Sequence, residues 1–165
     1  MQIPKRKAGQ YAHLKPDPNL TENKYNELKE KLAKLKRTHP LAAAEVKRLA
    51  EMGDFSDNAA YSIAKGRLRG INQRIVELED HLKRAVIIRP EENTGTVMLG
   101  NHVTLEIAGK QKKYQILGSS ETNPQAGIIS HRSALGSALM GRRVGDKVKI
   151  KTIDKEVEYT LIKIE

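Results

Sequence analysis

The chain has 165 residues, with 30 Lys and Arg against 20 Asp and Glu, which gives a formal net charge of +10. This excess favours a polyanionic partner such as nucleic acid. Aromatic residues make up only 4% of the chain and cysteine is absent, so a base-stacking surface is disfavoured, and disulfides and thiolate metal sites are excluded. No apolar run approaches the roughly 20 residues that span a bilayer, so a cytoplasmic protein without a membrane partner is expected.

Residues 1–19 are interpreted as a flexible basic arm. They contain four basic residues, one acid and three prolines, and they show no apolar periodicity. Such an arm is either a contact for nucleic acid or an ordinary disordered terminus, and both interpretations stay open.

Apolar residues at heptad spacing predict a long helix in the following segment. From Tyr25 to Leu49 the apolar positions alternate at intervals of three and four residues when His39 is counted in the series, and Thr21 is suited to be the N-cap. Pro40 removes one backbone hydrogen bond, so it is expected to kink this helix or to split it.

A second series of apolar residues, from Tyr61 to Ala85, is the mirror image of the first about Phe55. Each apolar position has a counterpart at the same distance along the chain on the other side of this residue. Antiparallel packing pairs heptad positions in this way. Residues 20–85 are therefore predicted to form an antiparallel coiled-coil hairpin. At about 1.5 Å per residue, arms of roughly 30 residues make a rod about 45 Å long.

The remaining residues, 86–165, change to short β-type runs and predict a compact α+β domain. Ser133 to Met140 predict a short helix that Gly141 ends. A short strand at 96–99 is left open. The other expected strands cover residues 86–88, 102–107, 112–117, 148–152 and 157–164, and residues 128–129 form a short apolar segment.

The turn of the hairpin, residues 53–61, carries two carboxylates three residues apart. Asp57 is suited to cap or begin the second helix, where its charge opposes the helix dipole, whereas Asp54 follows Gly53 in the turn itself. Two carboxylates at a protruding tip can share a hard cation such as Mg²⁺. Because two oxygen donors are too few for a tight site, further ligands would come from a partner. The pair is therefore either a set of caps or half of a metal site.

A basic strip follows this turn on the second helix, where no acid occurs between Asp57 and Glu77. Such a strip suits a phosphate backbone, although an ordinary solvated helix face is the alternative. The strip consists of Lys65, Arg67, Arg69 and Arg74. No P-loop, metal-binding histidine spacing or triad pattern is found, so nothing indicates an enzyme that acts alone.

These motifs together resemble the Gre transcript-cleavage factors. Gly-Asp-Phe-Ser-Asp-Asn-Ala-Ala-Tyr at 53–61 is similar to the tip motif of that family, usually Gly-Asp-Leu-x-Glu-Asn-Ala-Glu-Tyr. Residues 129–141 are similar to its C-terminal signature, and Pro40 falls where the family commonly has a proline. The resemblance runs from about residue 20 to the end of the chain.

The resemblance implies a fold and a function. Gre factors join an N-terminal antiparallel coiled coil to a C-terminal α+β domain similar to FK506-binding proteins. That domain is expected to dock on bacterial RNA polymerase while the rod enters the secondary channel, and the polymerase then cleaves its own backtracked nascent RNA. The protein itself, expected to be a monomer, would not be an enzyme. The signature residues matched to docking are Ser133, Leu135, Gly136, Leu139 and Gly141.

The same resemblance assigns roles within the tip. Asp54 and Asp57 are the acids expected to hold a Mg²⁺ shared with the polymerase active centre, and the chain by itself is expected to bind no cofactor. Lys65 sits where the family usually has a basic residue that can contact the transcript. The residues expected to shape the turn are Gly53, Phe55, Asn58 and Tyr61.

The chain departs from the family pattern at three of these positions. Asp57 stands where Glu is usual, which shortens the side chain by one methylene, about 1.5 Å. Ala60 replaces a second common Glu, and Ala134 replaces the signature proline. Two alternatives to a cleavage factor stay open: an inhibitor that occupies the same channel, and a free nucleic-acid-binding module that uses the basic strip and the arm.

Overall fold

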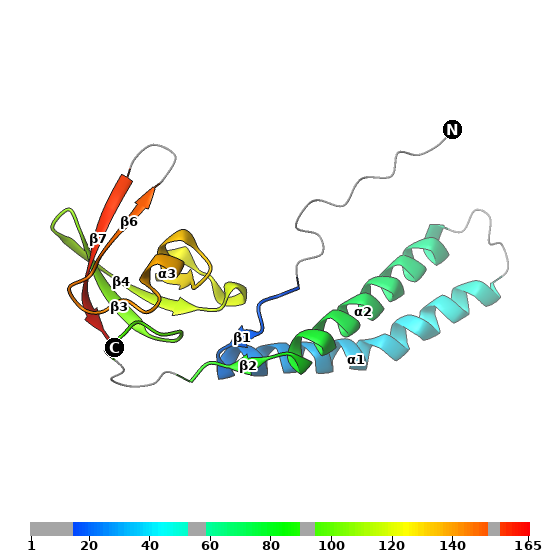
Figure 1. The fold of residues 1–165 in the computed structure, drawn as a ribbon. Coiled ribbons are helices and arrows are strands. Elements are labelled where there is room, and N and C mark those ends of the chain that lie inside the picture. Colours follow the sequence, from blue (N-terminus) through cyan, green and yellow to red (C-terminus); the bar gives the residue numbers. More distant parts are fainter. Residues whose placement is uncertain (1–14, 53–58, 90–94, 152–155) are drawn as a thin grey trace.

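The computed structural model describes residues 15–52, 59–89, 95–151 and 156–165. They form a long helical hairpin and a separate sheet domain, joined at the base of the hairpin (Figure 1). The α+β architecture predicted from the sequence is confirmed.

Two antiparallel helices build the rod. They are α1 (Glu22–Glu51) and α2 (Ala59–Lys83). Two ion pairs join them, Lys36 to Glu79 at 2.6 Å and Arg67 to Glu45 at 3.8 Å. Glu45 and Arg67 lie at nearly equal separations along the chain from residue 55, and Lys36 and Glu79 lie further along the two helices, as an antiparallel hairpin requires. Among the described helices, none is both long and apolar enough to cross a membrane.

Pro40 lies inside α1, and the helix continues through it. Of the two expected effects of this proline, a kink or a split, the split is therefore wrong. One turn earlier, the Thr38 hydroxyl donates a hydrogen bond to the Leu35 carbonyl oxygen at 3.0 Å. A proline removes only one of the many backbone bonds of a 30-residue helix, and the contacts of α1 with α2 help to keep the helix intact.

A two-residue parallel ladder closes the base of the rod. It joins β1 (Asn19–Leu20) to β2 (Val86–Ile87), and Leu20 is completely buried. The short run at β2 was predicted, but its partner was not, because residues 15–19 were assigned to the flexible arm. The structure corrects this boundary, since Asp17 is only 3% exposed.

The sheet domain has five strands in the order β5-β4-β3-β7-β6, antiparallel except for the parallel β4–β5 pair. They are β3 (His102–Ile107), β4 (Lys110–Leu117), β5 (Ile128–Ser130), β6 (Lys147–Lys151) and β7 (Glu156–Ile164). Ala108 and Gly109, both with positive φ, form the tight turn between β3 and β4. The described residues 95–101 contain no strand, so the one considered at 96–99 is wrong.

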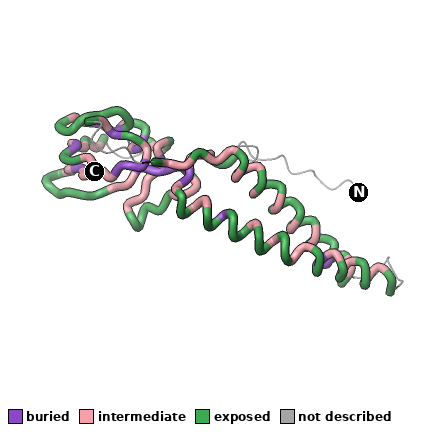
Figure 2. The backbone as a smooth tube through the Cα atoms, turned by 90° about the horizontal axis from the view of Figure 1, so that it is seen from below, coloured by how far each residue is buried: buried purple, intermediate pink, exposed green. Residues whose placement is uncertain are grey.

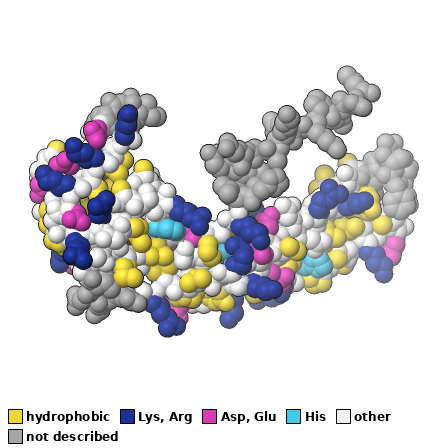
Figure 3. All heavy atoms as spheres, viewed as in Figure 1, with side chains coloured by type: hydrophobic (Ala, Val, Ile, Leu, Met, Phe, Trp, Pro, Cys, Tyr) yellow, Lys and Arg dark blue, Asp and Glu magenta, His cyan; other side chains and the backbone are white. Residues whose placement is uncertain are grey.

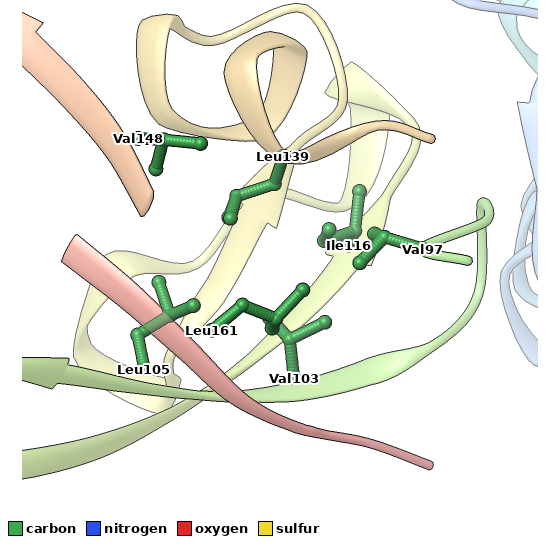
Figure 4. Packing of buried hydrophobic residues seen from close by; sticks show 7 residues of the cluster. All are labelled: Val97, Val103, Leu105, Ile116, Leu139, Val148 and Leu161. Atoms are coloured by element: carbon green, nitrogen blue, oxygen red, sulfur yellow. The ribbon is translucent and has the colours of Figure 1, made fainter. Parts of the chain in front are cut away.

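The short helix α3 (Ala134–Leu139) closes one side of this sheet, as predicted. Two 3₁₀ turns, η1 (Ser119–Glu121) and η2 (Pro124–Ala126), precede it. Side chains from α3, the strands and the turn at Val97 meet in one buried cluster (Figure 4). The cluster consists of Val97, Val103, Leu105, Ile116, Leu139, Val148 and Leu161.

Candidate functional site

The predicted acidic tip belongs to the end of the rod that lies farthest from the sheet domain. α1 ends at Glu51 and α2 begins at Ala59, and both positions lie at this end (Figure 1). The tip residues Gly53, Asp54, Phe55, Asp57 and Asn58 lie outside the described residues, so their roles and the Mg²⁺ site stay predictions. Within the part of the chain that is described, no cluster of three His, Asp or Glu side chains is arranged to hold a metal ion.

Tyr61 and Lys65 occupy the first turns of α2, directly behind the tip. The Lys65 Nζ lies 5.6 Å from the centroid of the Tyr61 ring. At this distance the ring face attracts an ammonium group, by about 0.5–1 kcal/mol for an exposed pair. Because Tyr61 lies one turn closer to the tip, the contact directs the Lys65 ammonium toward the tip.

The basic strip lies on two faces of α2, and its four side chains are exposed. Arg67 pairs with Glu45 of α1 at 3.8 Å, so the prediction of a strip without compensating acids is wrong at this position. The acid comes from the other helix, which the sequence of α2 alone does not reveal. Among the described residues, no carboxylate pairs with Lys65, Arg69 or Arg74. These three cations are therefore the available part of the strip, and Figure 3 shows Lys and Arg side chains along the visible face of the rod.

The signature residues of the sheet domain hold α3 in place. The Ser133 hydroxyl accepts a hydrogen bond from the Gly136 amide at 3.0 Å and donates one to the Ser130 carbonyl oxygen at 2.7 Å. A Cβ at Gly136 would collide with that same oxygen, and Leu139 is completely buried. Gly136 and Leu139 thus act in packing, and any contact with a polymerase would involve the surface that they support.

The remaining two signature residues, Leu135 and Gly141, also lie in or next to α3. Leu135 is half-buried against the core cluster, and Gly141 adopts φ +75° directly after the helix, as expected for a residue that ends it. The docking role of the five signature residues stays a prediction.

An exposed patch adjoins this signature, and sequence reasoning missed it. Met140 is 36% exposed and Val144 is 57% exposed, and Arg142 and Arg143 between them are also exposed. The sequence feature that could have identified this patch is the Arg-Arg pair between two apolar residues, just after the predicted short helix. Large apolar side chains on a surface, combined with arginine, are typical of protein interfaces.

The two parts of the chain match two family models. Residues 19–87 match the model described as "Transcription elongation factor, N-terminal". Residues 91–165 match the model described as "Transcription elongation factor, GreA/GreB, C-term". Together these matches cover the rod and the sheet domain.

Individual proteins agree with these matches. The chain is 39% identical over 150 residues to the transcription elongation factor GreA of Sphingopyxis alaskensis, covering 90% of this chain and 94% of the relative. It is 38% identical over 149 residues to GreA of Nautilia profundicola, covering 88% and 92%. The chain therefore belongs to the GreA/GreB family of transcription elongation factors.

A solved structure is also similar in sequence over nearly its whole length. It is the GreA factor homolog 1 (Gfh1) of Thermus thermophilus, with 32% identity, coverage of 90% of this chain and 99% of that chain, and a TM-score of 0.41.

Proposed function

We propose that this protein enters the secondary channel of bacterial RNA polymerase and stimulates cleavage of the backtracked transcript. The polymerase performs the hydrolysis, and the factor donates the carboxylates of Asp54 and Asp57. The observation that carries the proposal is the tip motif at 53–61, which separates two antiparallel helices at the end of the rod opposite the sheet domain. The family membership of both halves supports it.

The chemistry of the donors fits this role. Carboxylate oxygens are ligands that Mg²⁺ prefers, and Mg²⁺ bound between factor and polymerase would supply charge neutralisation and activation of water. Asp54 and Asp57 would hold that ion and orient the water that attacks the transcript. The exposed cations of Lys65, Arg69 and Arg74 behind the tip would hold the phosphates of the extruded nascent RNA.

Docking is assigned to the sheet domain. The exposed patch of Met140, Arg142, Arg143 and Val144 combines apolar area with two guanidinium groups. Such a surface suits an acidic protein partner with an apolar centre. The factor would dock through this domain and leave the rod free to enter the channel.

A cleavage assay on stalled bacterial elongation complexes tests the proposal. We expect the protein to shorten the 3′ end of the RNA well above the intrinsic rate of the polymerase. The variant with Asp54→Asn and Asp57→Asn should return cleavage to background, because neutral amides bind Mg²⁺ far more weakly. Glu51→Gln is the matched control, since it removes a carboxylate next to the tip without altering the motif. Background cleavage with the unaltered protein would refute the proposal.

Inhibition of the polymerase on the same scaffold is the second candidate, and Asp57 favours it. The aspartate is shorter than the usual glutamate by about 1.5 Å, and a misplacement of about 1 Å can cost on the order of a hundredfold in rate. Asp57→Glu restores the longer side chain. If this variant cleaves while the unaltered protein only slows RNA synthesis, the inhibitor assignment is correct.

A free nucleic-acid-binding module is distinguished by binding without polymerase. Strong, salt-dependent binding to bare RNA or DNA would support it. The Arg67–Glu45 ion pair weakens this candidate, because it neutralises one of the four cations of the strip.

A further inference from the structure

The segment that precedes the rod is held between the rod and the sheet domain. On the side of the sheet domain, Glu121 of η1 reaches the start of α1. Its Oε1 accepts a hydrogen bond from the Thr21 amide at 2.7 Å, and its Oε2 accepts one from the Thr21 hydroxyl at 2.6 Å. The same hydroxyl accepts a hydrogen bond from the Lys24 amide at 3.2 Å. The carboxylate of one domain thus completes the N-cap of the helix of the other.

A second carboxylate, that of Asp17, also links the segment before the rod to the sheet domain. Asp17 lies four residues before Thr21 in the chain. Asp17, whose side chain is fully buried, accepts a hydrogen bond from the Ser119 amide at 3.0 Å through Oδ2. Its Oδ1 accepts from the amide of Asn19 at 3.1 Å. The Nδ1 of His131 and the Nε of Arg132 lie 3.6 and 3.7 Å from Oδ2. All but Asn19 belong to the sheet domain, so Asp17 also joins the two domains.

The charge of Asp17 is stabilised where it lies. Burial acts to raise the pKa of Asp17, but hydrogen bonds from Ser119 and Asn19 hold this pKa below the ordinary value of 3.8. The carboxylate is therefore ionised at neutral pH. Hydrogen bonds to an ionised acceptor are roughly twice as strong as those between neutral groups.

The same segment is fastened to the base of the rod on its other side. The Nε2 of the buried His81 of α2 donates a hydrogen bond to the backbone carbonyl oxygen of Asp17 at 2.8 Å. Shortly after Asp17 in the chain, β1 pairs with β2 at the base of the rod. Residues 17–21 therefore contact both the rod and the sheet domain.

The fit between the two domains is close at Gly118. A Cβ at this position would collide with the backbone oxygen of Asn19. Only a residue without a side chain lets the turn before η1 approach the segment this closely. The hydrogen bonds of Asp17 and Glu121 are thus made across a tightly packed junction.

We infer that Asp17 and Glu121 are positioning residues that form a clasp, which sets the direction of the rod relative to the sheet domain. The inference rests on the proposed function, in which the sheet domain docks and the tip must reach the polymerase active centre. The longer helix of the rod, α1, has 30 residues and is therefore about 45 Å long, so a rotation of about 5° at its base displaces its far end by about 4 Å. A displacement of this size is large compared with the tolerance of a catalytic group.

Distance measurements on the protein alone test the geometry. Because the chain has no cysteine, Ser62→Cys and Gln111→Cys, both at exposed positions, give one spin label near the tip and one on the sheet domain. Pulsed electron resonance should report a narrow distance distribution. Adding Asp17→Ala and Glu121→Ala should broaden it. The matched pair Glu158→Ala and Glu165→Ala, whose carboxylates pair only within the sheet domain, should leave it narrow.

Cleavage by the same variants tests the role in function. Without the clasp, we expect the cleavage rate at saturating factor to fall about tenfold, whereas the half-saturating concentration changes less than about threefold, because docking is retained. Gly118→Ala keeps both carboxylates and should shift the mean distance instead of broadening it, with a similar fall in rate. Thermal melting of each variant verifies that the sheet domain is folded.

The outcomes separate the two hypotheses. A broadened distribution with a reduced maximal rate supports the clasp. If the unaltered protein stimulates cleavage and the clasp variants keep both its narrow distribution and its maximal rate, the positioning role is wrong while the proposed function stands. A broadened distribution at full rate also overturns that role. If the unaltered protein does not stimulate cleavage, the proposed function fails, and the positioning role fails with it.

Discussion

The rod and the sheet domain are stabilised in different ways. Within the described parts of α1 and α2, only Leu28, Ala42, Ala64 and His81 are buried, and most seam residues are half-buried. The sheet domain instead surrounds a cluster of seven buried apolar side chains. Figure 2 shows this difference as alternating exposed and intermediate residues along the rod.

The difference follows from shape. Two helices side by side can shield only one stripe of each other, whereas a sheet covered by a helix encloses side chains from several directions. The rod therefore has many weak contacts spread over its length. The length of the rod carries the tip away from the sheet domain, and the junction between the two domains sets the orientation of the rod.

Equal truncations in the two regions should have unequal effects. Leu105→Ala in the sheet domain should lower its free energy of unfolding by about 2–5 kcal/mol, because Leu105 is completely buried. Leu68→Ala in the half-buried seam of α2 should cost clearly less. Hydrogen exchange of amides in β3 and α2 would measure the two effects separately. Equal losses would contradict the contrast between the regions.

The stability of the rod should increase when the proline inside α1 is replaced. Pro40→Ala restores one backbone hydrogen bond and should stabilise α1 by about 1–3 kcal/mol, since proline inside a helix costs about 3 kcal/mol relative to alanine. Slower exchange of the α1 amides is the measurement. Lys34→Ala, at an exposed site on the same helix, is the control and should have little effect. Faster exchange in the Pro40→Ala variant would show that the rod needs the proline.

Glycines should respond in opposite directions in the two regions. No atom lies within 4 Å of a Cβ added at Gly66 or Gly70 of α2, so each change to alanine should stabilise the rod by about 0.5–1 kcal/mol. Gly136→Ala in the sheet domain should destabilise it, because the new Cβ meets the Ser130 oxygen. Denaturant unfolding followed by circular dichroism compares the three variants. A loss of stability at Gly66 or Gly70 would reveal a packing role that the structure does not contain.

The smallest expected effect is that of low pH on the contribution of Glu165, the last residue of the sheet domain, to stability. Hydrogen bonds from Lys113 and Lys163 lower the pKa of Glu165 from 4.5 to about 2. A lowered pKa means that the stabilising contribution is present above pH 4.5 and is lost as the pH falls through about 2. Titration of the Glu165 carboxyl carbon by NMR measures this pKa directly. In the Lys113→Met variant we expect the value to move back toward 4.5, and an unchanged value would refute this assignment.

The sequence by itself determined the rod and most of the strands. The mirrored heptads specify an antiparallel hairpin because the burial of one stripe has a fixed period, and a period is visible in one dimension. The Thr21 cap and the short helix before Gly141 are likewise local. The acidic tip motif is also a local pattern, so its identification needed no coordinates.

Contacts between distant residues had to come from the tertiary structure. Asp17 lies in the segment interpreted from the sequence as a flexible arm, and Glu121 lies outside every strand and helix predicted from the sequence. Neither segment shows an apolar periodicity. Glu45 neutralises Arg67 from the other helix, and Met140 and Val144 become a surface only once α3 covers the sheet. Packing and charge pairing depend on the distance between residues in the folded molecule, and this distance cannot be deduced from a single sequence. The clasp that directs the rod is therefore visible only in the folded molecule.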